Sequence, residues 1–312
     1  MATLDRSAAM VLDMIRLSGA PATNTLTPEQ ARTAYRAARA ALSPEPPPLT
    51  DIRDLAAPGR NGAIPLRRYR DGANPAPRAG MVYYHGGGWV IGDLDTHDVV
   101  CRQIAQRTGA IVVAVDYRMG PEHKFPAAVE DAIDATAWIA ANAADLGIDP
   151  HRLAIAGDSA GGNLAAVVAI DARDNHGPAL ALQALIYPSI AMSMTSPSQV
   201  EFAEGYGLTH ETMIYFRTHY LRGPDDMQDW RAAPIRAAHH ENLPPALIIT
   251  AGFDPLRDEG EDYATTLVKS GVPVTLRRFP GQIHGFITMG RVIPEATEAI
   301  NEIANAMAAR GL

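Results

Sequence analysis

The stretch that most constrains this chain runs from Leu153 to Asn163 and reads LAIAGDSAGGN. A short apolar strand leads into Gly-x-Ser-x-Gly at residues 157–161, and a helical sequence follows directly. Such a sharp strand-to-helix corner needs small neighbours, because the backbone turns tightly and glycine adopts positive φ at little cost. The corner would hold the Ser159 hydroxyl clear of the sheet, at the positive end of the following helix. This arrangement is typical of a nucleophilic serine on a strand–turn–helix elbow.

The motif alone does not establish a nucleophile. With glycine and serine each at about 7% of residues, roughly one chain of this length in ten would contain Gly-x-Ser-x-Gly by chance. A serine hydroxyl is also a poor nucleophile near neutral pH, so it needs a general base, and the base needs a third group that fixes its tautomer. The rest of the chain must therefore supply a histidine and an acid.

Two residues further along the chain meet this requirement. Asp254 follows the apolar stretch 246–250, and His284 follows the predicted strand 274–279, in the order serine, acid, histidine. Parallel strands place the residues beyond their carboxyl ends at one edge of a sheet. Asp258 is a competing acid, which we interpret as a helix cap or a helper. Alone, Asp254 would be a helix-entry cap and His284 an exposed loop histidine, but together behind the serine they predict a triad.

A glycine-rich segment after the strand ending at Tyr84 predicts a site for an oxyanion. It reads His85-Gly86-Gly87-Gly88-Trp89, and its glycines let backbone N–H groups approach a substrate closely. Together with the N–H group of Ala160, which follows the serine, Gly86, Gly87 and Gly88 are the candidate oxyanion hole. A phosphate-binding loop is the alternative, but neither Gly-Lys-Ser/Thr nor Gly-x-Gly-x-x-Gly is present. We interpret His85 as a structural hydrogen-bonding residue.

Composition excludes several classes of partner. The chain has 312 residues, and its 27 Lys+Arg against 35 Asp+Glu give a net charge of −8, which does not suit nucleic acid or an anionic membrane. The single cysteine, Cys101, cannot form an internal disulfide, and we expect it to pack in the core rather than act as a nucleophile. Charges interrupt the N-terminus before a signal peptide could form, and no apolar run could cross a bilayer. We expect a cytoplasmic protein.

Hydrophobic patterning predicts an α/β fold with a mostly parallel sheet covered by helices on both faces. We expect an edge strand at 64–70 and further strands at 80–84, 110–116, from 153, 183–187, 246–250 and 274–279. The expected helices lie at 98–108, 125–145 and 294–309. The first 45 residues should be helical, with Thr27 as a cap, and a proline-rich linker should follow at 43–48.

One segment interrupts the alternation of strands and helices. Residues 190–231 contain no strand pattern but many methionine and aromatic residues. This insertion could be a helical excursion with its own packing, or a lid over the active site together with the N-terminal helices. We favour the lid, because an apolar acyl group needs an apolar roof. The chain is therefore interpreted as one domain, with a cap from 1–45 and 190–231 and a core from 50–189 and 232–312.

These motifs resemble the hormone-sensitive-lipase-type branch of the α/β-hydrolases, the family IV bacterial carboxylesterases. The resemblance covers most of residues 50–312 and includes HGGGW, GDSAGGN and the stretches at 116–128, 254–260 and 284–286. One departure is Met119-Gly120, where the family usually has Leu-Ala. The resemblance implies the α/β-hydrolase fold, a two-part cap, no metal or cofactor, and often a homodimer. It also implies that Glu122, His97 and Asp98 support the oxyanion loop.

The function that the resemblance implies is hydrolysis of short- to medium-chain carboxylic esters, with a small-molecule ester as the only partner required. An amidase or a lactonase could use the same triad. A binding module on this fold would usually lack the histidine, which is present here. His239 and His240 do not match the spacing of a zinc site.

Overall fold

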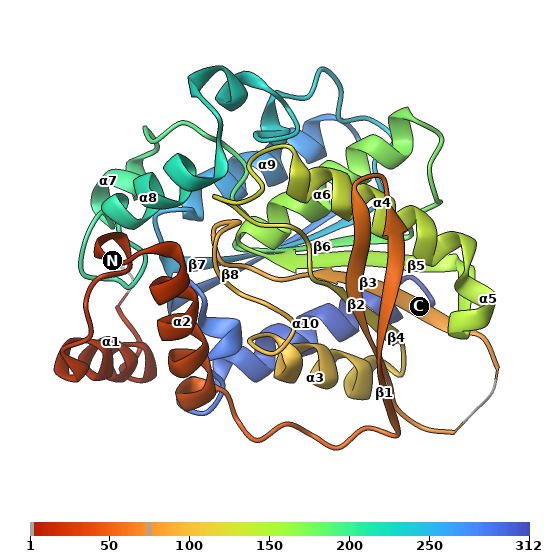
Figure 1. Cartoon of the computed structure of the whole chain (residues 1–312), viewed down its shortest axis with the longest axis horizontal. Coiled ribbons are helices and arrows are strands. Elements are labelled where there is room, and N and C mark those ends of the chain that lie inside the picture. The colour runs from red at the N-terminus through yellow and green to blue at the C-terminus, as the bar shows by residue number, and fades with distance from the viewer. Residues whose placement is uncertain (1–2, 74–75) are drawn as a thin grey trace.

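The computed structural model of the chain describes residues 3–73 and 76–312, and a single eight-stranded sheet runs through it (Figure 1). The strands lie in the order β1-β2-β4-β3-β5-β6-β7-β8. The pairs β1–β2 and β2–β4 are antiparallel and the other five pairs are parallel, so the mostly parallel sheet and the α/β-hydrolase fold are confirmed. The strands are β1 (Asp51–Gly59), β2 (Gly62–Arg70), β3 (Arg78–Tyr84), β4 (Ile111–Val115), β5 (Ile148–Asp158), β6 (Leu182–Ile186), β7 (Ala246–Phe253) and β8 (Val274–Ile283).

Helices cover both faces of this sheet. The α-helices are α1 (Arg6–Ser18), α2 (Pro28–Leu42), α3 (Asp98–Thr108), α4 (Ala127–Ala141), α5 (Ala143–Leu146), α6 (Ala160–Asp174), α7 (Pro197–Glu201), α8 (His210–Tyr220), α9 (Arg257–Lys269) and α10 (Glu295–Ala308). Short 3₁₀ helices are η1 (Thr23–Thr25), η2 (Pro224–Gln228), η3 (Pro234–Arg236) and η4 (Phe286–Thr288). Figure 1 shows α4, α6 and α9 on one face and α3 and α10 on the other.

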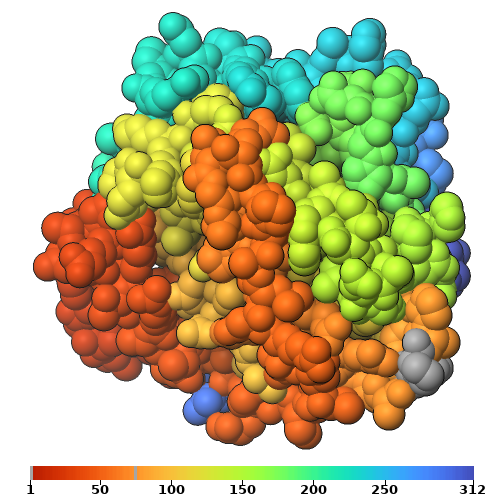
Figure 2. All heavy atoms as spheres, turned by 45° about the vertical axis from the view of Figure 1, so that its right-hand side comes forward, coloured from red at the N-terminus to blue at the C-terminus, as the bar shows by residue number. Residues whose placement is uncertain are grey.

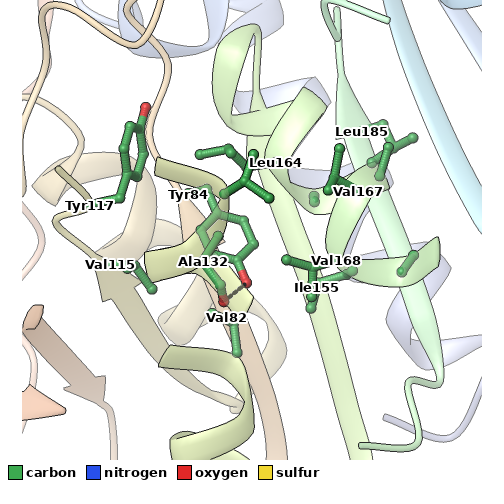
Figure 3. Close-up of a cluster of buried hydrophobic side chains, with 14 of the residues drawn as sticks. Val82, Tyr84, Val115, Tyr117, Ala132, Ile155, Leu164, Val167, Val168 and Leu185 are labelled. Atoms are coloured by element: carbon green, nitrogen blue, oxygen red, sulfur yellow. Dashed lines mark hydrogen bonds between the residues drawn. The ribbon is translucent and has the colours of Figure 1, made fainter. Parts of the chain in front are cut away.

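Each face of the sheet has its own apolar core. On the α4/α6 face, Val82, Tyr84 and Ile155 pack against Leu164 and Val168, as Figure 3 shows. The one polar atom of this group is satisfied, because the Tyr84 hydroxyl donates to the carbonyl of Ala132 at 3.2 Å. The opposite face buries residues of α3 and α10. Strands that are buried on both faces explain why the central strands read as continuous apolar runs.

The N-terminal edge of the sheet differs from the prediction. The expected edge strand at 64–70 is β2, and it lies inside the sheet between β1 and β4. The edge strand is β1, which was not predicted, because Ala57 is its only buried residue and Pro58 lies near its end. An edge strand exposes most of its side chains and tolerates proline, so it carries no apolar signal. Figure 2 shows this hairpin, in orange, crossing the front of the molecule.

The segments interpreted as a cap lie together beside the sheet. Helix α2 begins with the predicted capping box, in which Thr27 and Gln30 exchange side-chain and backbone hydrogen bonds. The linker at 43–48 is not helical, and the insertion at 190–231 contains only α7, α8 and η2. Figure 1 shows α1 and α2 next to α7 and α8. These segments contain the helices and the non-helical linker that the sequence predicts.

Cys101 lies in α3 with no exposed surface, as expected for a packing residue. Burial raises the pKa of its thiol well above the ordinary value. Within the described residues, no helix has the length and apolar character needed to span a bilayer.

Candidate active site

The corner between β5 and α6 holds Ser159 in an unusual backbone conformation, with φ 55° and ψ −117°. The positive φ therefore falls on the serine itself and not, as the sequence pattern predicts, on the flanking glycines. Those glycines provide room instead. A Cβ atom on Gly161 would lie 1.9 Å from the carbonyl oxygen of Tyr84, and one on Gly157 would lie 2.3 Å from that of Gly161. The Ser159 N–H group donates to the Ile186 carbonyl at 2.8 Å, which fixes the corner to β6.

The three residues predicted as a triad meet at the carboxyl edge of the sheet. His284 Nε2 lies 2.9 Å from Ser159 Oγ, and His284 Nδ1 lies 2.8 Å from Asp254 Oδ2. The Asp254 side chain has no exposed surface, and its other oxygen accepts the N–H group of Leu256 at 2.8 Å. Because the carboxylate can only accept, the hydrogen of the imidazole lies on Nδ1 and Nε2 faces the serine as an acceptor.

The competing acid, Asp258, faces elsewhere. Its carboxylate accepts the N–H group of Ser198 at 2.7 Å and pairs with Arg257. These contacts tie the start of α9 to α7, so the helper interpretation fits the structure better than a role as the triad acid.

The loop after β3 presents backbone N–H groups beside this constellation. Gly87 and Gly88 have φ values of 123° and 60°, which glycine adopts without strain. In the described part of the chain their N–H groups donate to no protein acceptor, and neither does the N–H group of Ala160 at the start of α6. The N–H group of Gly86 differs, because it donates to Asp158 Oδ1 at 2.9 Å. Gly86 is therefore an anchor of the loop, with its donor already engaged.

Asp158, which sequence reasoning missed, is the buried partner of this loop. Only 3% of the residue is exposed, and its carboxylate also accepts the Tyr83 hydroxyl at 3.0 Å and lies 3.2 Å from His97 Nε2. Burial acts to raise the pKa of Asp158, but His97 and Tyr83 outweigh it and hold that pKa below its ordinary value. The available signal was an acidic residue in an apolar strand end, since a buried carboxylate must have partners.

The family resemblance implies three supporting residues, and the structure gives each of them a different partner. His97 contacts Asp158 and so reaches the oxyanion loop through one side chain. Glu122 pairs with Arg32 of α2 at 2.6 Å. The Asp98 carboxylate instead pairs with Arg102 in α3 and lies 3.7 Å from Arg67.

His85 has the structural role that the sequence predicted. Its ring stacks on Tyr117 with centroids 4.4 Å apart, and Nδ1 donates to the Gly86 carbonyl at 2.9 Å. Burial, with His97 nearby, lowers the pKa of His85 to about 4, although Asp158 and Asp93 oppose that shift. Asp116 lies 3.8 Å from the other ring nitrogen. The ring is therefore neutral near pH 7.

This buried imidazole should make the free energy of unfolding depend on pH. Below the ordinary pKa of 6.5 the unfolded chain protonates His85, whereas the native state does not until about pH 4, so stability is lost as pH falls through this window. The pKa difference corresponds to ~3 kcal/mol. In His85→Gln, whose amide can still donate to Gly86, we expect the loss from pH 6.5 to 4 to shrink by up to that amount.

Urea unfolding of wild type and variant at matched pH values measures this difference. His151→Gln is the matched control, because His151 is exposed, and its curve should run parallel to that of the wild type. Parallel curves for His85→Gln as well would contradict the assigned cause.

An aromatic side chain from the insertion covers the oxyanion loop. Phe216 of α8 lies so close to Gly88 that a Cβ atom on that glycine would be 2.2 Å from the phenyl ring. Phe216 also packs on an apolar cluster formed by Ala31 and Tyr215 with Val90 and Ile91 of the loop. Residues from α2 and α8 thus meet in one apolar cluster with residues of this loop.

Comparisons with known proteins identify the family of the chain. A family described as the alpha/beta hydrolase fold matches residues 81–288, and the chain belongs to this family, in its hormone-sensitive-lipase-type branch. The carboxylic ester hydrolase LipN of Mycobacterium tuberculosis is 41% identical, over 98% of this chain and 83% of its own. The ethyl acetate hydrolase of Pseudomonas putida is 38% identical, over 97% and 93%.

A solved structure has nearly the same fold. It is an ester-hydrolase from the metagenome of Lake Arreo, complexed with a derivative of bipyridine phosphonate. It is 39% identical in sequence, with a TM-score of 0.95 over 98% of this chain and 99% of its own.

Proposed function

We propose that the protein is a serine carboxylesterase that hydrolyses short- to medium-chain carboxylic esters through an acyl-serine intermediate. The observation that carries the proposal is the line of contacts from Asp254 through His284 to Ser159, with separations of 2.8 and 2.9 Å. The relatives named as ester hydrolases support the same class of reaction.

In the proposed mechanism, Ser159 Oγ attacks the ester carbonyl carbon while His284 Nε2 takes the hydroxyl proton. Asp254 holds the imidazole through Nδ1 and stabilises the positive charge that develops on it. The negative charge on the former carbonyl oxygen is stabilised by the free N–H groups of Gly87, Gly88 and Ala160, while Gly86 anchors the loop.

The tetrahedral intermediate then collapses. The alcohol leaves with the proton from His284, and the acyl group stays on Ser159. A water molecule, deprotonated by His284, attacks the acyl-serine and releases the carboxylic acid. No further chemical group is needed for either half-reaction.

We further propose that 1–45 and 190–231 form a cap, with the catalytic core in 50–189 and 232–312. The position of Phe216 over Gly88 and the cluster that joins α2 to α8 support this division. An apolar roof of this kind favours an apolar acyl group over a charged one. The homodimer and the cytoplasmic location stay predictions.

The proposed substrate class is tested by matched esters, amides and lactones offered to the purified protein. We expect hydrolysis of p-nitrophenyl esters from acetate to octanoate, and kcat/KM at least about 100-fold lower for the corresponding amides, because the amine is a poorer leaving group. Faster hydrolysis of the amides or lactones would instead favour the alternative assignments.

The acyl-length series also tests the roof. Phe216→Ala removes the ring over Gly88, so its optimum should move to longer acyl chains while the rate on acetate changes by less than about fivefold. Met14→Ala, which truncates an exposed side chain on α1, is the matched control and should leave the optimum unchanged. An unchanged optimum in Phe216→Ala would place the acyl group elsewhere.

A further inference from the structure

We infer that Arg32 of helix α2 is a positioning residue for the oxyanion hole, an inference that rests on the proposed esterase function. The N-terminal helices would then have a second task besides covering the site. They would hold the loop whose N–H groups must point at the developing negative charge.

The guanidinium of Arg32 connects three places on the loops around the site. Its Nε donates to the carbonyl of Val90 at 2.8 Å, and Nη2 donates to the carbonyl of Gly120 at the same distance. Both terminal nitrogens also contact the carboxylate of Glu122, at 2.8 and 2.6 Å. Only 20% of the Arg32 side chain is exposed, whereas 53% of Glu122 is.

The carbonyls of Val90 and Gly120 belong to residues that are hydrogen-bonded to the oxyanion loop. The N–H groups of Val90 and Ile91 both donate to the carbonyl of Gly87, at 3.1 and 2.9 Å, and so close a tight turn around Gly88. The N–H group of Gly120 donates to the carbonyl of Trp89 at 2.9 Å, which joins this turn to the neighbouring loop. Arg32 completes the connection from the other side, because it links the Val90 and Gly120 carbonyls through one planar group.

A second contact of α2 reaches the same loop by a different route. Arg36, one helical turn further on, pairs with Asp93. Asp93 Oδ1 accepts the N–H group of Thr96 at 2.8 Å, and Thr96 Oγ1 lies 3.0 Å from His97 Nδ1. His97 in turn contacts Asp158, the anchor of Gly86. The same face of α2 therefore holds the loop at both of its ends.

The position of this loop matters because N–H donors stabilise an oxyanion strongly only when they already point at it. Loss of one donor in such a site lowers kcat by about 10²–10³. Loss of the Arg32 contacts leaves every N–H donor in place but fixes their positions less well, so the expected fall in kcat is smaller. We expect Arg32→Gln to lower kcat by about 10- to 100-fold while KM changes by less than about threefold, because ground-state contacts of the substrate stay in place.

A trifluoromethyl ketone provides a readout that a merely structural role would not move. It forms a tetrahedral adduct with the serine and places an oxyanion in the same hole, so its Ki should rise in Arg32→Gln by about the factor that kcat/KM falls. The Ki of a product carboxylate, which needs no tetrahedral oxyanion, should stay within about twofold. The pH profile of kcat should keep its shape, because the triad is untouched.

Three further variants make the result decisive. Arg32→Met keeps an unbranched side chain but has no hydrogen-bond donor for the two carbonyls, so it should share the kcat defect even if Arg32→Gln folds poorly. Glu122→Gln removes the exposed ion pair and leaves the carbonyl contacts, and it should lower kcat by less than about threefold. Arg16→Gln, on the exposed face of α1, should match the wild type.

The inference is overturned if folded Arg32→Gln or Arg32→Met keeps kcat within about twofold of the wild type, or if the Ki of the trifluoromethyl ketone does not rise. Ser159→Ala in the same assay separates this failure from that of the proposed function. If Ser159→Ala retains activity, the esterase mechanism is wrong. If Ser159→Ala is inactive and Arg32→Gln is as active as the wild type, only the positioning role of Arg32 is contradicted.

Discussion

Ser159→Ala should lower kcat on a p-nitrophenyl ester by about 10⁶-fold, or ~8 kcal/mol of transition-state stabilisation. The variant loses the oxygen that forms the acyl bond, but it keeps the pocket of N–H groups. Binding of substrate should therefore persist, with KM within about fivefold, while turnover falls to the level that the remaining site supports. Stopped-flow and long-time assays on the same preparation cover the required range of rates.

An organophosphonate adds a second readout for this residue. Mass spectrometry of the labelled wild type should place the adduct on the peptide that contains Ser159, and Ser159→Ala should remain unlabelled. Ser189→Ala is the matched control, because its N–H group donates to the Ser159 carbonyl and the residue lies beside the corner. It should keep kcat within about twofold. Labelling of Ser159→Ala, or residual turnover above about 1%, would contradict the assignment of the nucleophile.

Asp254→Asn should lower kcat by about 10⁴-fold with little change in fold. The asparagine oxygen can still accept the N–H group of Leu256, so the loop keeps its anchor. Its NH₂ group would then face His284 Nδ1 and donate to it, which moves the imidazole hydrogen to Nε2. In that tautomer the ring cannot take a proton from Ser159, and this is the physical reason for the loss.

Asp258→Asn is the control for this prediction, because it removes the competing acid four residues away. Its carboxylate accepts the N–H group of Ser198 and so ties α7 to α9, and we therefore expect a lower midpoint of thermal unfolding with kcat within about tenfold of the wild type. If Asp258→Asn lost as much turnover as Asp254→Asn, the two acids would have to exchange roles.

The sequence pattern predicts the central strands. It also predicts that Ser159, Asp254 and His284 lie close together. Strands buried on two faces carry long apolar runs, and residues beyond the ends of parallel strands share one edge of the sheet. The family motifs then placed the glycine loop beside the serine. In contrast, β1 was missed because its side chains are mostly exposed, so no burial pattern distinguishes it from a loop.

The supporting contacts could not be predicted for a different reason. The distance between Asp158 and Gly86 depends on how the loop after β3 folds back over the end of β5, which no local spacing encodes. Arg32 contacts Gly120 although the two residues are 88 positions apart in the sequence. A long polar side chain such as that of Arg32 has many candidate partners, and only the packed structure shows which of them it contacts.

The burial of Cys101 has a practical consequence. Thiol-reactive dyes have no other native cysteine to attack, and the Cys101 thiol is buried beneath α3 with a raised pKa. A single cysteine introduced at Val200, which is 74% exposed on α7, would therefore carry the fluorophore alone. Movement of α7 could then be followed optically during turnover, in a protein that needs no prior removal of thiols.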